Sequence, residues 1–327
     1  MRRRTFIAAL GGAAAWPVVA RAQQAMPVIG VLNMTSQRYG EAMYKPPLLK
    51  GLADQGLIIG RNFAMENRWA DDHPERLPEL AAALVRHQPA LIVAGGGTLP
   101  AQAARAASTT IPIVFTGGAD PVKAGVVQSL NHPGGNTTGA MLLISELGAK
   151  RLALLHELLP GVRSIGVLAD PSVPANESQD EELSTAAEQL GIVLNAVPIT
   201  NEDALDGAFA EFARQRVGGV LVHTSARLQG AWSPRIALLA ARYSLPTLYG
   251  GRNNAQTGGL ASYGADVGEA YRQAGVYAAR ILRGEKAGDL PVVRVTRLEL
   301  VINLKTAQVL GLEIPPMLLA RADEVIE

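Results

Sequence analysis

Short apolar runs alternate along this chain with segments that repeat apolar side chains every three to four residues. Residues 28–32, 90–94 and 111–115 form such runs, which predict buried strands. Between them, residues 77–85 carry Leu, Ala and Val at the spacing of an amphipathic helix, and Thr98 is placed to cap a second helix. Strands that alternate with helices predict a parallel sheet covered by helices on both faces.

The same alternation begins again after residue 160. Strands are expected at 165–169, 193–199, 220–223 and 247–249, with helices at 176–190, near 205–212 and at 233–243. One segment shows the duplication directly, because Ile111–Gly117 and Leu245–Gly251 both run apolar-Pro-apolar into a strand that ends in a Gly-containing turn. We therefore predict two similar lobes.

The C-terminal part adds elements to these lobes rather than a third domain. A strand is expected at 259–263, a helix at 267–282, extended chain at 292–302 and a short helix at 306–310. The predicted fold class is α/β, with two Rossmann-like lobes built on parallel sheets. We assign residues 27–143 plus about 264–300 to lobe one, and about 144–263 plus 301–327 to lobe two. The strand ends would then line a ligand cleft between the lobes.

The N-terminus has the pattern of a cleaved export signal. Arg2-Arg3-Arg4 precedes an uncharged stretch that ends in Ala20-Arg21-Ala22, a small-residue cleavage signal, so residues 1–22 are predicted to be a signal peptide. The arginine pair followed by Thr5-Phe6-Ile7 resembles a twin-arginine signal. A membrane anchor needs about 20 strongly apolar residues, and this stretch is shorter and contains Pro17.

Composition narrows the location and the partners. The leader holds four arginines and no acid, so its removal changes the net charge from +1 to −3, which argues against nucleic-acid binding. The chain has no cysteine, which excludes disulfides, thiolate metal sites and a lipidated N-terminal Cys. We expect a free periplasmic protein, monomeric and not inserted in the membrane once the leader is removed.

Catalytic patterns are missing from the sequence. It contains neither G-x-S-x-G nor H-E-x-x-H, and the five histidines are not at metal-ligand spacing. The glycine-rich stretch Gly134–Gly139 is followed by no Lys-Ser/Thr, so it is not a phosphate loop. We expect no enzyme activity, no metal and no cofactor.

Polar and aromatic residues recur where predicted strands end, at the edge where α/β sheets bind ligands. Hydroxyls and helix-start N–H groups suit a carboxylate, and tyrosines suit a flat ligand. The candidate ligand-binding residues are Gln37, Thr98, Thr116, Gly118, Asp120, Asn176, Thr224, Ser225, Tyr249 and Tyr263.

An ordered series of motifs resembles a known family. The series comprises Pro112–Phe115, Asp120-Pro121-Val122, Pro133–Gly139, Gly258–Gly264, Ala279–Gly284, Asp289-Leu290-Pro291, Leu300–Ala307, Ile314-Pro315-Pro316 and Ala322–Ile326. It is similar to the tryptophan-binding-protein-like family of ABC transporter substrate-binding proteins, over nearly all of the mature chain. The resemblance implies a type I periplasmic-binding-protein fold with three crossings and hinge closure over a ligand, and an inner-membrane ABC permease as partner.

The resemblance leaves the ligand open among amino acids, aromatic acids and amides. Some members have a Thr-Asp pair after the third strand of lobe two, where the Asp would face the ligand's ammonium. This chain has His223-Thr224-Ser225 there, so our hypothesis is a small organic acid or amide, held by hydroxyls and helix-start N–H groups. The alternatives are a sensory receptor on the same fold and, third, a secreted α/β enzyme.

Overall fold

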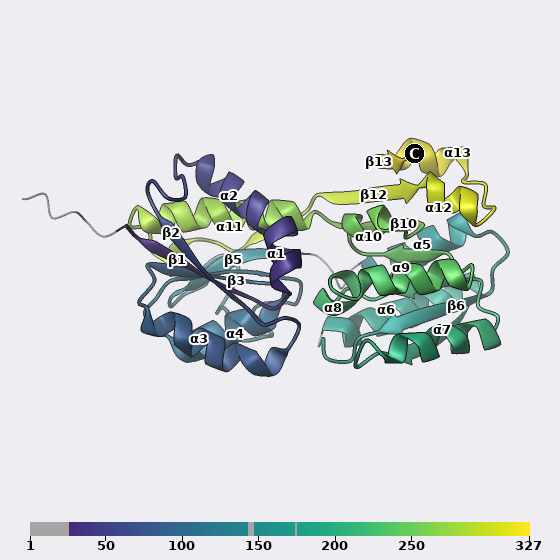
Figure 1. Ribbon diagram of the computed structural model, residues 1–327, viewed down its shortest axis with the longest axis horizontal. Helices are drawn as coiled ribbons and strands as arrows, with labels where there is room; N and C mark the ends of the chain where they lie inside the picture. Colours follow the sequence, from purple (N-terminus) through teal and green to yellow (C-terminus); the bar gives the residue numbers. More distant parts are fainter. Residues whose placement is uncertain (1–25, 143–146, 174) are drawn as a thin grey trace, which may run out of the picture.

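The computed structural model describes residues 26–142, 147–173 and 175–327, and these form two α/β lobes that lie side by side (Figure 1). The predicted signal peptide lies outside the described residues. We call the six-stranded sheet with its helices lobe one and the seven-stranded sheet with its helices lobe two.

Lobe one is built on a sheet with the order β11-β5-β4-β3-β1-β2, and all its strand pairs are parallel. Its first ten elements are β1 (Val28–Asn33), α1 (Gln37–Met43), α2 (Lys45–Ala53), β2 (Ala64–Trp69), η1 (Pro74–Arg76), α3 (Leu77–Arg86), β3 (Leu91–Gly95), α4 (Thr98–Ala107), β4 (Ile113–Gly117) and β5 (Thr137–Leu142). Three elements from much later in the sequence complete it: α11 (Val267–Leu282), η3 (Ala287–Asp289) and β11 (Val293–Val295).

Lobe two has the strand order β13-β12-β10-β9-β8-β6-β7. Its elements are α5 (Gly148–Leu158), β6 (Ser164–Ala169), α6 (Ala175–Leu190), β7 (Val193–Pro198), α7 (Ala204–Arg214), β8 (Gly219–Val222), α8 (Ala226–Gln229), α9 (Ser233–Arg242), β9 (Thr247–Tyr249), α10 (Arg252–Gln256), β10 (Ala261–Ala265), β12 (Leu298–Asn303), α12 (Leu304–Val309), α13 (Pro316–Arg321) and β13 (Glu324–Ile326). Its pairs are parallel except β10 with β12, which is antiparallel. The fold class is thus confirmed, with one antiparallel pair in otherwise parallel sheets.

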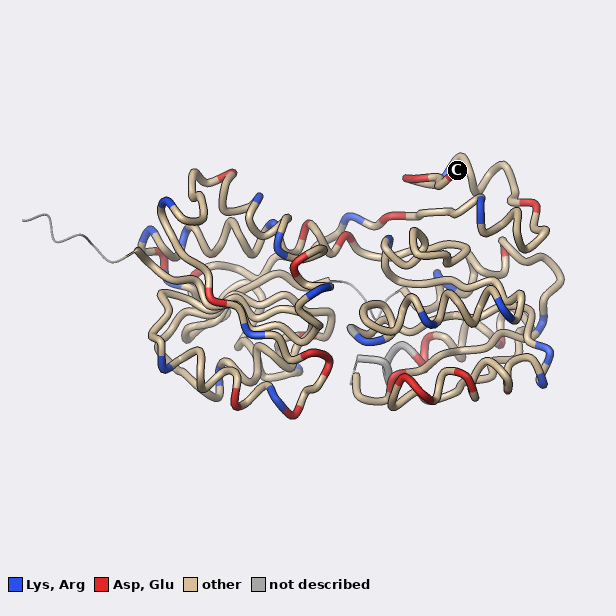
Figure 2. The backbone as a smooth tube through the Cα atoms, in the orientation of Figure 1, with Lys and Arg blue, Asp and Glu red and all other residues tan. Residues whose placement is uncertain are grey.

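Each sheet separates two apolar cores. In lobe one, α2 and α11 pack on one face, and α3 and α4 pack on the other. In lobe two, α5 and α6 cover one face, and α7 and α9 cover the other. Strands with helices on both sides are apolar throughout, as β3 shows, since all five of its residues are buried. The charged residues lie mainly outside these cores, on both lobes (Figure 2).

The chain passes between the lobes between β5 and α5, between β10 and α11, and between β11 and β12. The last two crossings are tied together, because the Asp266 backbone N–H donates to the Arg297 carbonyl at 3.1 Å. Asp266 also caps α11, since its carboxylate accepts the Glu269 N–H at 3.0 Å. The crossings therefore form a defined base from which the two lobes extend.

Two local expectations were wrong or incomplete. Thr98 is the first residue of α4 rather than its cap; the cap is Gly97, whose φ of 126° favours glycine. The edge strand β2 was not predicted, because its sequence AMENRW is half-buried and carries charges, as edge strands often do.

Candidate functional site

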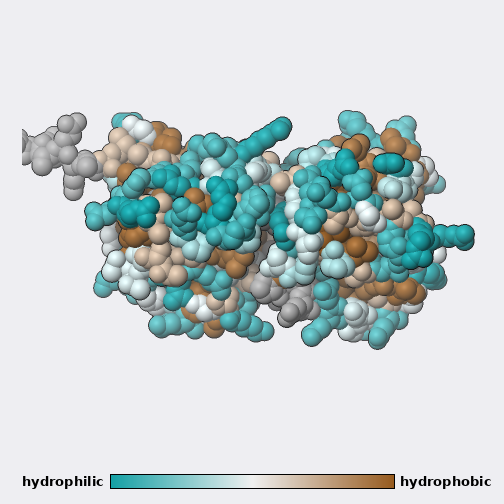
Figure 3. Space-filling model, turned by 60° about the horizontal axis from the view of Figure 1, so that its bottom comes forward, coloured by the Kyte–Doolittle hydropathy of each residue, from teal (hydrophilic) through white to brown (hydrophobic). Residues whose placement is uncertain are grey.

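The two lobes face each other with the segments that follow the carboxyl ends of their strands. The Asn253 side chain of α10 in lobe two lies beside the Tyr39 hydroxyl of α1 in lobe one. Asp72, which follows β2, is attracted by Arg227 of α8 across the same gap. The surface is hollowed between the lobes (Figure 3). This is the edge at which parallel α/β sheets bind ligands.

Lobe one contributes a buried hydrogen-bonded pair at this edge. Asn33, the last residue of β1, is fully buried, and its Nδ2 donates to the Tyr271 hydroxyl at 2.9 Å. Its Oδ1 accepts from the backbone N–H and the hydroxyl of Thr35, at 3.1 and 3.0 Å. Burial raises the pKa of Tyr271 to about 12, although Thr116 and Asn33 act against the rise. Tyr271 is therefore a neutral phenol fixed at the end of the first strand.

Two further tyrosines, Tyr44 and Tyr39, extend from Tyr271 toward lobe two. Tyr44 stacks on Tyr271 with ring centroids 4.4 Å apart, and Tyr39 meets Tyr44 edge-on at 5.3 Å. Burial raises the pKa of Tyr39 and that of Tyr44. Such pairs favour a fixed ring geometry, so lobe one carries an ordered aromatic group that reaches Asn253 through Tyr39.

Lobe two contributes a buried ion pair. Asp170, which follows β6, is 1% exposed and accepts from Arg227 Nη2 at 2.5 Å and from Nε at 3.2 Å. Arg227 also donates to Ser172 Oγ at 2.6 Å and lies 5.0 Å from the Trp232 ring centre. Burial acts to raise the pKa of Asp170, but hydrogen bonds from Arg227, Ser172 and Ser225 outweigh it and the pKa is lowered. Asp170 is thus ionised, and it fixes the Arg227 guanidinium at the edge of lobe two.

Asp72 faces this ion pair from lobe one. It adopts a left-handed φ of 62°, and its Oδ1 is buried without a hydrogen-bond partner in the described part of the chain. Burial raises the pKa of its carboxyl to about 6; Arg227 opposes the rise, and Asp71 and Asp170 reinforce it. Lobe one therefore presents an acid that is partly protonated near neutral pH.

A second polar group gathers around Gly250, directly after β9. A Cβ added there would lie 2.6 Å from Thr224 Oγ1, 2.8 Å from Gln229 Nε2 and 3.1 Å from Arg151 Nη2. Only a residue without a side chain lets the backbone pass so close to these three groups.

His223 adjoins this group and is fully buried. Its Nε2 lies 3.1 Å from Asp180 Oδ1, but the approach is not aligned as a hydrogen bond. Burial lowers the pKa of His223; Asp180 opposes this and Arg151 reinforces it. The imidazole is therefore neutral at pH 7.

The structure brings some of the predicted residues into these groups. Thr116 contacts Tyr271 in lobe one, Thr224 lies beside Gly250, and Ser225 caps α8 by accepting the Leu228 N–H at 3.0 Å. Thr116 and Ser225 are buried, and Thr224 is partly exposed.

Other predicted residues lie at the surface of their turns. Gln37 is the exposed first residue of α1, and Thr98 and Gly118 are partly exposed. Asp120 is exposed, and its Oδ1 accepts the N–H groups of Val122 and Lys123 at 2.8 and 3.2 Å, so it closes its own turn. Asn176 lies in α6, but its side chain is outside the described part.

The expectation that Tyr249 would stack on a ligand is wrong for this conformation. Tyr249 is 0% exposed and belongs to the core beneath α7 and α9, where Gly259 leaves room for its ring. Tyr263 packs its ring against the other core of lobe two, and its carbonyl accepts from Arg151 Nε at 2.8 Å. Tyr249 ends β9 and Tyr263 lies within β10, and side-chain alternation directs their rings into the cores.

We did not predict a role at the site for Asn33, Asp72, Arg151, Arg227 and Tyr271. A strand-end position is the signal that could have identified Asn33 and Asp72. Arg151 and Tyr271 lie inside helices, where periodicity marks a core face but not a contact with a distant strand end.

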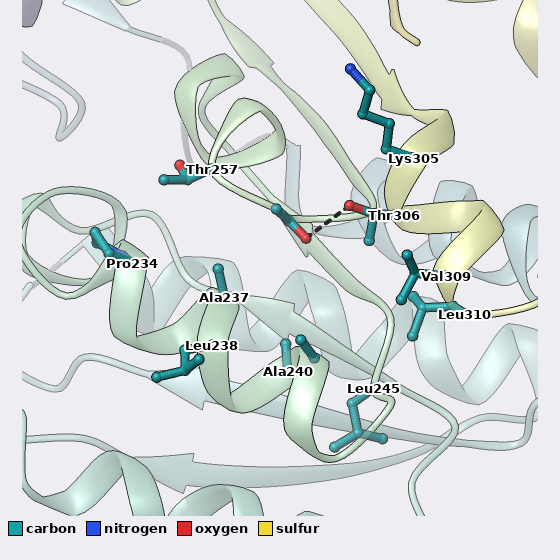
Figure 4. A pocket seen from close by; sticks show the side chains of 12 residues that line it. Pro234, Ala237, Leu238, Ala240, Leu245, Thr257, Lys305, Thr306, Val309 and Leu310 are labelled. Atoms are coloured by element: carbon teal, nitrogen blue, oxygen red, sulfur yellow. Dashed lines mark hydrogen bonds between the residues drawn. The ribbon is translucent and has the colours of Figure 1, made fainter.

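A separate cavity of about 430 Å³ lies on lobe two between α9 and α12 (Figure 4). Its walls are mainly apolar, with Leu238, Leu245, Val309 and Leu310 among them. Thr306 adds a hydroxyl that already donates to the Gly258 carbonyl at 3.1 Å. This cavity therefore lacks the convergent polar groups of the interlobe edge.

No helix in the described ranges has the length and apolar character needed to cross a membrane.

Comparisons with known proteins agree with this geometry. A curated tyrosine-binding protein of Clostridioides difficile (strain R20291) is 28% identical over 269 residues, which are 82% of this chain and 76% of that protein. A conserved domain protein from Vibrio cholerae superimposes with a TM-score of 0.82 at 28% identity, covering 92% of this chain and 99% of that one. An ABC domain from Streptococcus pneumonia, solved in complex with L-Trp, gives the same TM-score and coverage at 25% identity. The family model for ABC transporter substrate binding proteins matches residues 29–326, and the chain therefore belongs to that family.

Proposed function

We propose that this chain is exported to the periplasm, binds a small organic solute between its lobes and delivers it to an inner-membrane ABC permease. The leader pattern of residues 1–22 supports export, and the family supports a binding protein rather than an enzyme. The observation that carries the proposal is the convergence of polar and aromatic groups from both lobes on one edge, joined across it by Tyr39 and Asn253.

The proposed solute is a small aromatic or organic acid, an amino acid or an amide. One relative is named for binding tyrosine, and another was solved with L-Trp, which supports an aromatic solute. The tyrosines of lobe one offer rings for stacking. At 223–225 this chain has no carboxylate to receive an ammonium group, which favours an acid or amide over a free amino acid.

Transport requires that the permease distinguish the loaded receptor from the empty one. A ligand that contacts both lobes stabilises the closed arrangement and shifts the population toward it. The crossings joined by Asp266 and Arg297 are the proposed hinge, since the chain passes between the lobes there.

A thermal-shift screen of the mature chain against amino acids, aromatic acids, amides and sugars tests the proposal. A ligand at a hundred times its dissociation constant adds about 2.7 kcal/mol to the free energy of unfolding. Small-angle scattering of any hit should show a more compact molecule. If no compound raises the melting temperature, or if a hit leaves the scattering profile unchanged, the receptor model is wrong.

A matched pair of variants tests the location of the site. Thr116→Val should weaken binding of the hit, because Thr116 contacts Tyr271 at the interlobe edge. Thr109→Val makes the same chemical change at an exposed position outside the helices and strands and should bind like the wild type. Equal affinity of both variants would remove Thr116 from the site.

A further inference from the structure

Arg151 of α5 is a buried cation, and no acidic side chain of the described residues forms an ion pair with it. It is 1% exposed, and its Nε donates to the Tyr263 carbonyl at 2.8 Å. Its Nη1 is buried and has no hydrogen-bond acceptor among the described residues. Burial lowers the pKa of the guanidinium to about 10, so it stays protonated at pH 7. A buried charge without an opposite charge is costly, so this arrangement favours an anion from outside the chain.

The guanidinium lies at the interlobe edge of lobe two. Helical side chains lean toward the N-terminus of their helix, and α5 begins directly after the chain enters lobe two. Arg151 accordingly reaches Tyr263 within β10 and Gly250 directly after β9. The first turn of α5 adds partial positive charge, and its cap residue Leu147 offers no side-chain acceptor.

The neighbours of Arg151 named here, all in the described part of the chain, offer hydrogen bonds but no negative charge. Thr224 Oγ1 is buried without a partner in the described part of the chain and lies, with Arg151 Nη2, next to Gly250. Gly250 has no side chain to cover these atoms. The nearby acids are engaged elsewhere, since Asp170 pairs with Arg227 and Asp180 lies against His223.

We propose that Arg151 and Thr224 receive the carboxylate of the solute, which makes the ligand of this receptor an organic acid. The Arg151 Nε already donates to the Tyr263 carbonyl, so the two Nη groups are left to bind the solute. Together they can donate to both oxygens of a planar carboxylate. The inference rests on the proposed function and narrows its solute class to acids.

Matched acids and amides test this assignment on the mature chain. The probes are benzoate and 3-phenylpropanoate, with benzamide and 3-phenylpropanamide as neutral partners, measured by calorimetry. Wild-type protein should bind the acids at least about 10-fold more tightly than the amides, since hydrogen bonds to a charged group are the stronger kind. Amides that bind as tightly as acids would overturn the proposal.

Variants separate an anion anchor from a packing residue. Arg151→Met should lose about 10- to 100-fold in acid affinity and a smaller factor in amide affinity, so the acid-to-amide ratio should fall. Arg163→Met is the control, because Arg163 is exposed at the opposite end of the same sheet. Thr224→Val, which keeps the shape of the side chain, should lose less acid affinity than Arg151→Met.

The ligand-free melting temperature decides between the two roles. An anchor that awaits its anion is an uncompensated charge, so Arg151→Met without ligand should melt no lower than wild type. A marked drop together with an unchanged acid-to-amide ratio would make Arg151 a structural tie to Tyr263 and refute the proposal. Should only neutral or cationic compounds bind in the wider screen, the receptor function stands and this inference fails; should nothing bind there, both fail.

Discussion

The contact between α2 and α11 predicts opposite effects for two chemically identical substitutions. Gly51 lies where α2 crosses α11, and a Cβ added there would be 1.9 Å from the Arg272 carbonyl oxygen. Gly207 is exposed in α7, and a Cβ there meets nothing within 4 Å. Both are helical, so replacement by alanine gains the same helix propensity of about 0.8–1.0 kcal/mol. The difference in unfolding free energy between the two variants therefore measures the cost of the packing contact alone.

The magnitude follows from the separation that the added methyl group demands. Real Cβ contacts do not fall below 3.0 Å, so α2 and α11 must move apart by about 1 Å in a core that is close-packed. Overpacking costs about 1–3 kcal/mol. After subtraction of the propensity gain, the middle of this range leaves a loss of about 1 kcal/mol of unfolding free energy for Gly51→Ala, whereas Gly207→Ala should gain up to about 1 kcal/mol.

Urea unfolding followed by tryptophan fluorescence can report each lobe separately. Beyond the predicted leader the chain contains Trp69 in lobe one and Trp232 in lobe two, so Trp→Phe backgrounds isolate the two signals. With a slope of about 2–3 kcal/mol per molar urea, Gly51→Ala should lower the lobe-one midpoint by about 0.5 M. If Gly51→Ala is as stable as wild type, or gains as much as Gly207→Ala, the close approach of the two helices is wrong.

Three further predictions concern lobe two and the interlobe edge. Phe212→Ala, which empties the space beside Gly166 in a fully buried cluster, should cost about 3–5 kcal/mol in urea unfolding; a loss below 1 kcal/mol would contradict the packing. Asp72→Asn should reduce the pH dependence of the melting temperature. The pKa of the Asp72 carboxyl is about 6 in the folded protein, above the ordinary 3.8, so wild-type stability falls as the pH rises between these values. An equal pH dependence of the melting temperature in both proteins would refute this. Arg227→Met should cost about 3–5 kcal/mol in thermal unfolding, because it leaves the Asp170 carboxylate buried without its cation; a neutral result would show that Asp170 is protonated.

The helices and strands predicted correctly are those with a strong local pattern. β1, β3, β6 and β8 are short apolar runs, and α11 repeats apolar residues over its length. These elements are buried on both faces or along one stripe, so burial alone shapes their sequences. The edge strand β2 lacks such a pattern because half of its surroundings are solvent or charged partners, such as the ion pair between Arg68 and Glu66.

The candidate site was predictable only where a residue lies close to the carboxyl end of a strand. Thr116, Thr224 and Ser225 meet that condition, and the structure places each of them at the interlobe edge. Tyr249 and Tyr263 meet it too, yet their rings turn into the cores, because strand-end position fixes where a backbone lies and not which face a side chain takes.

Arg151 shows what local sequence cannot contain. Within α5 it stands among buried leucines at the helical spacing of a core face, where an arginine reads as an exception to the pattern. Its environment is set by the Tyr263 carbonyl, 112 positions away, which accepts its hydrogen bond, and by Gly250, which has no side chain to collide with the guanidinium. Both partners reach it only because the second sheet brings β9 and β10 beside α5. A buried cation that forms no ion pair with a described carboxylate of its lobe is therefore a property of the assembled fold, and it is the feature from which the charge of the solute is inferred.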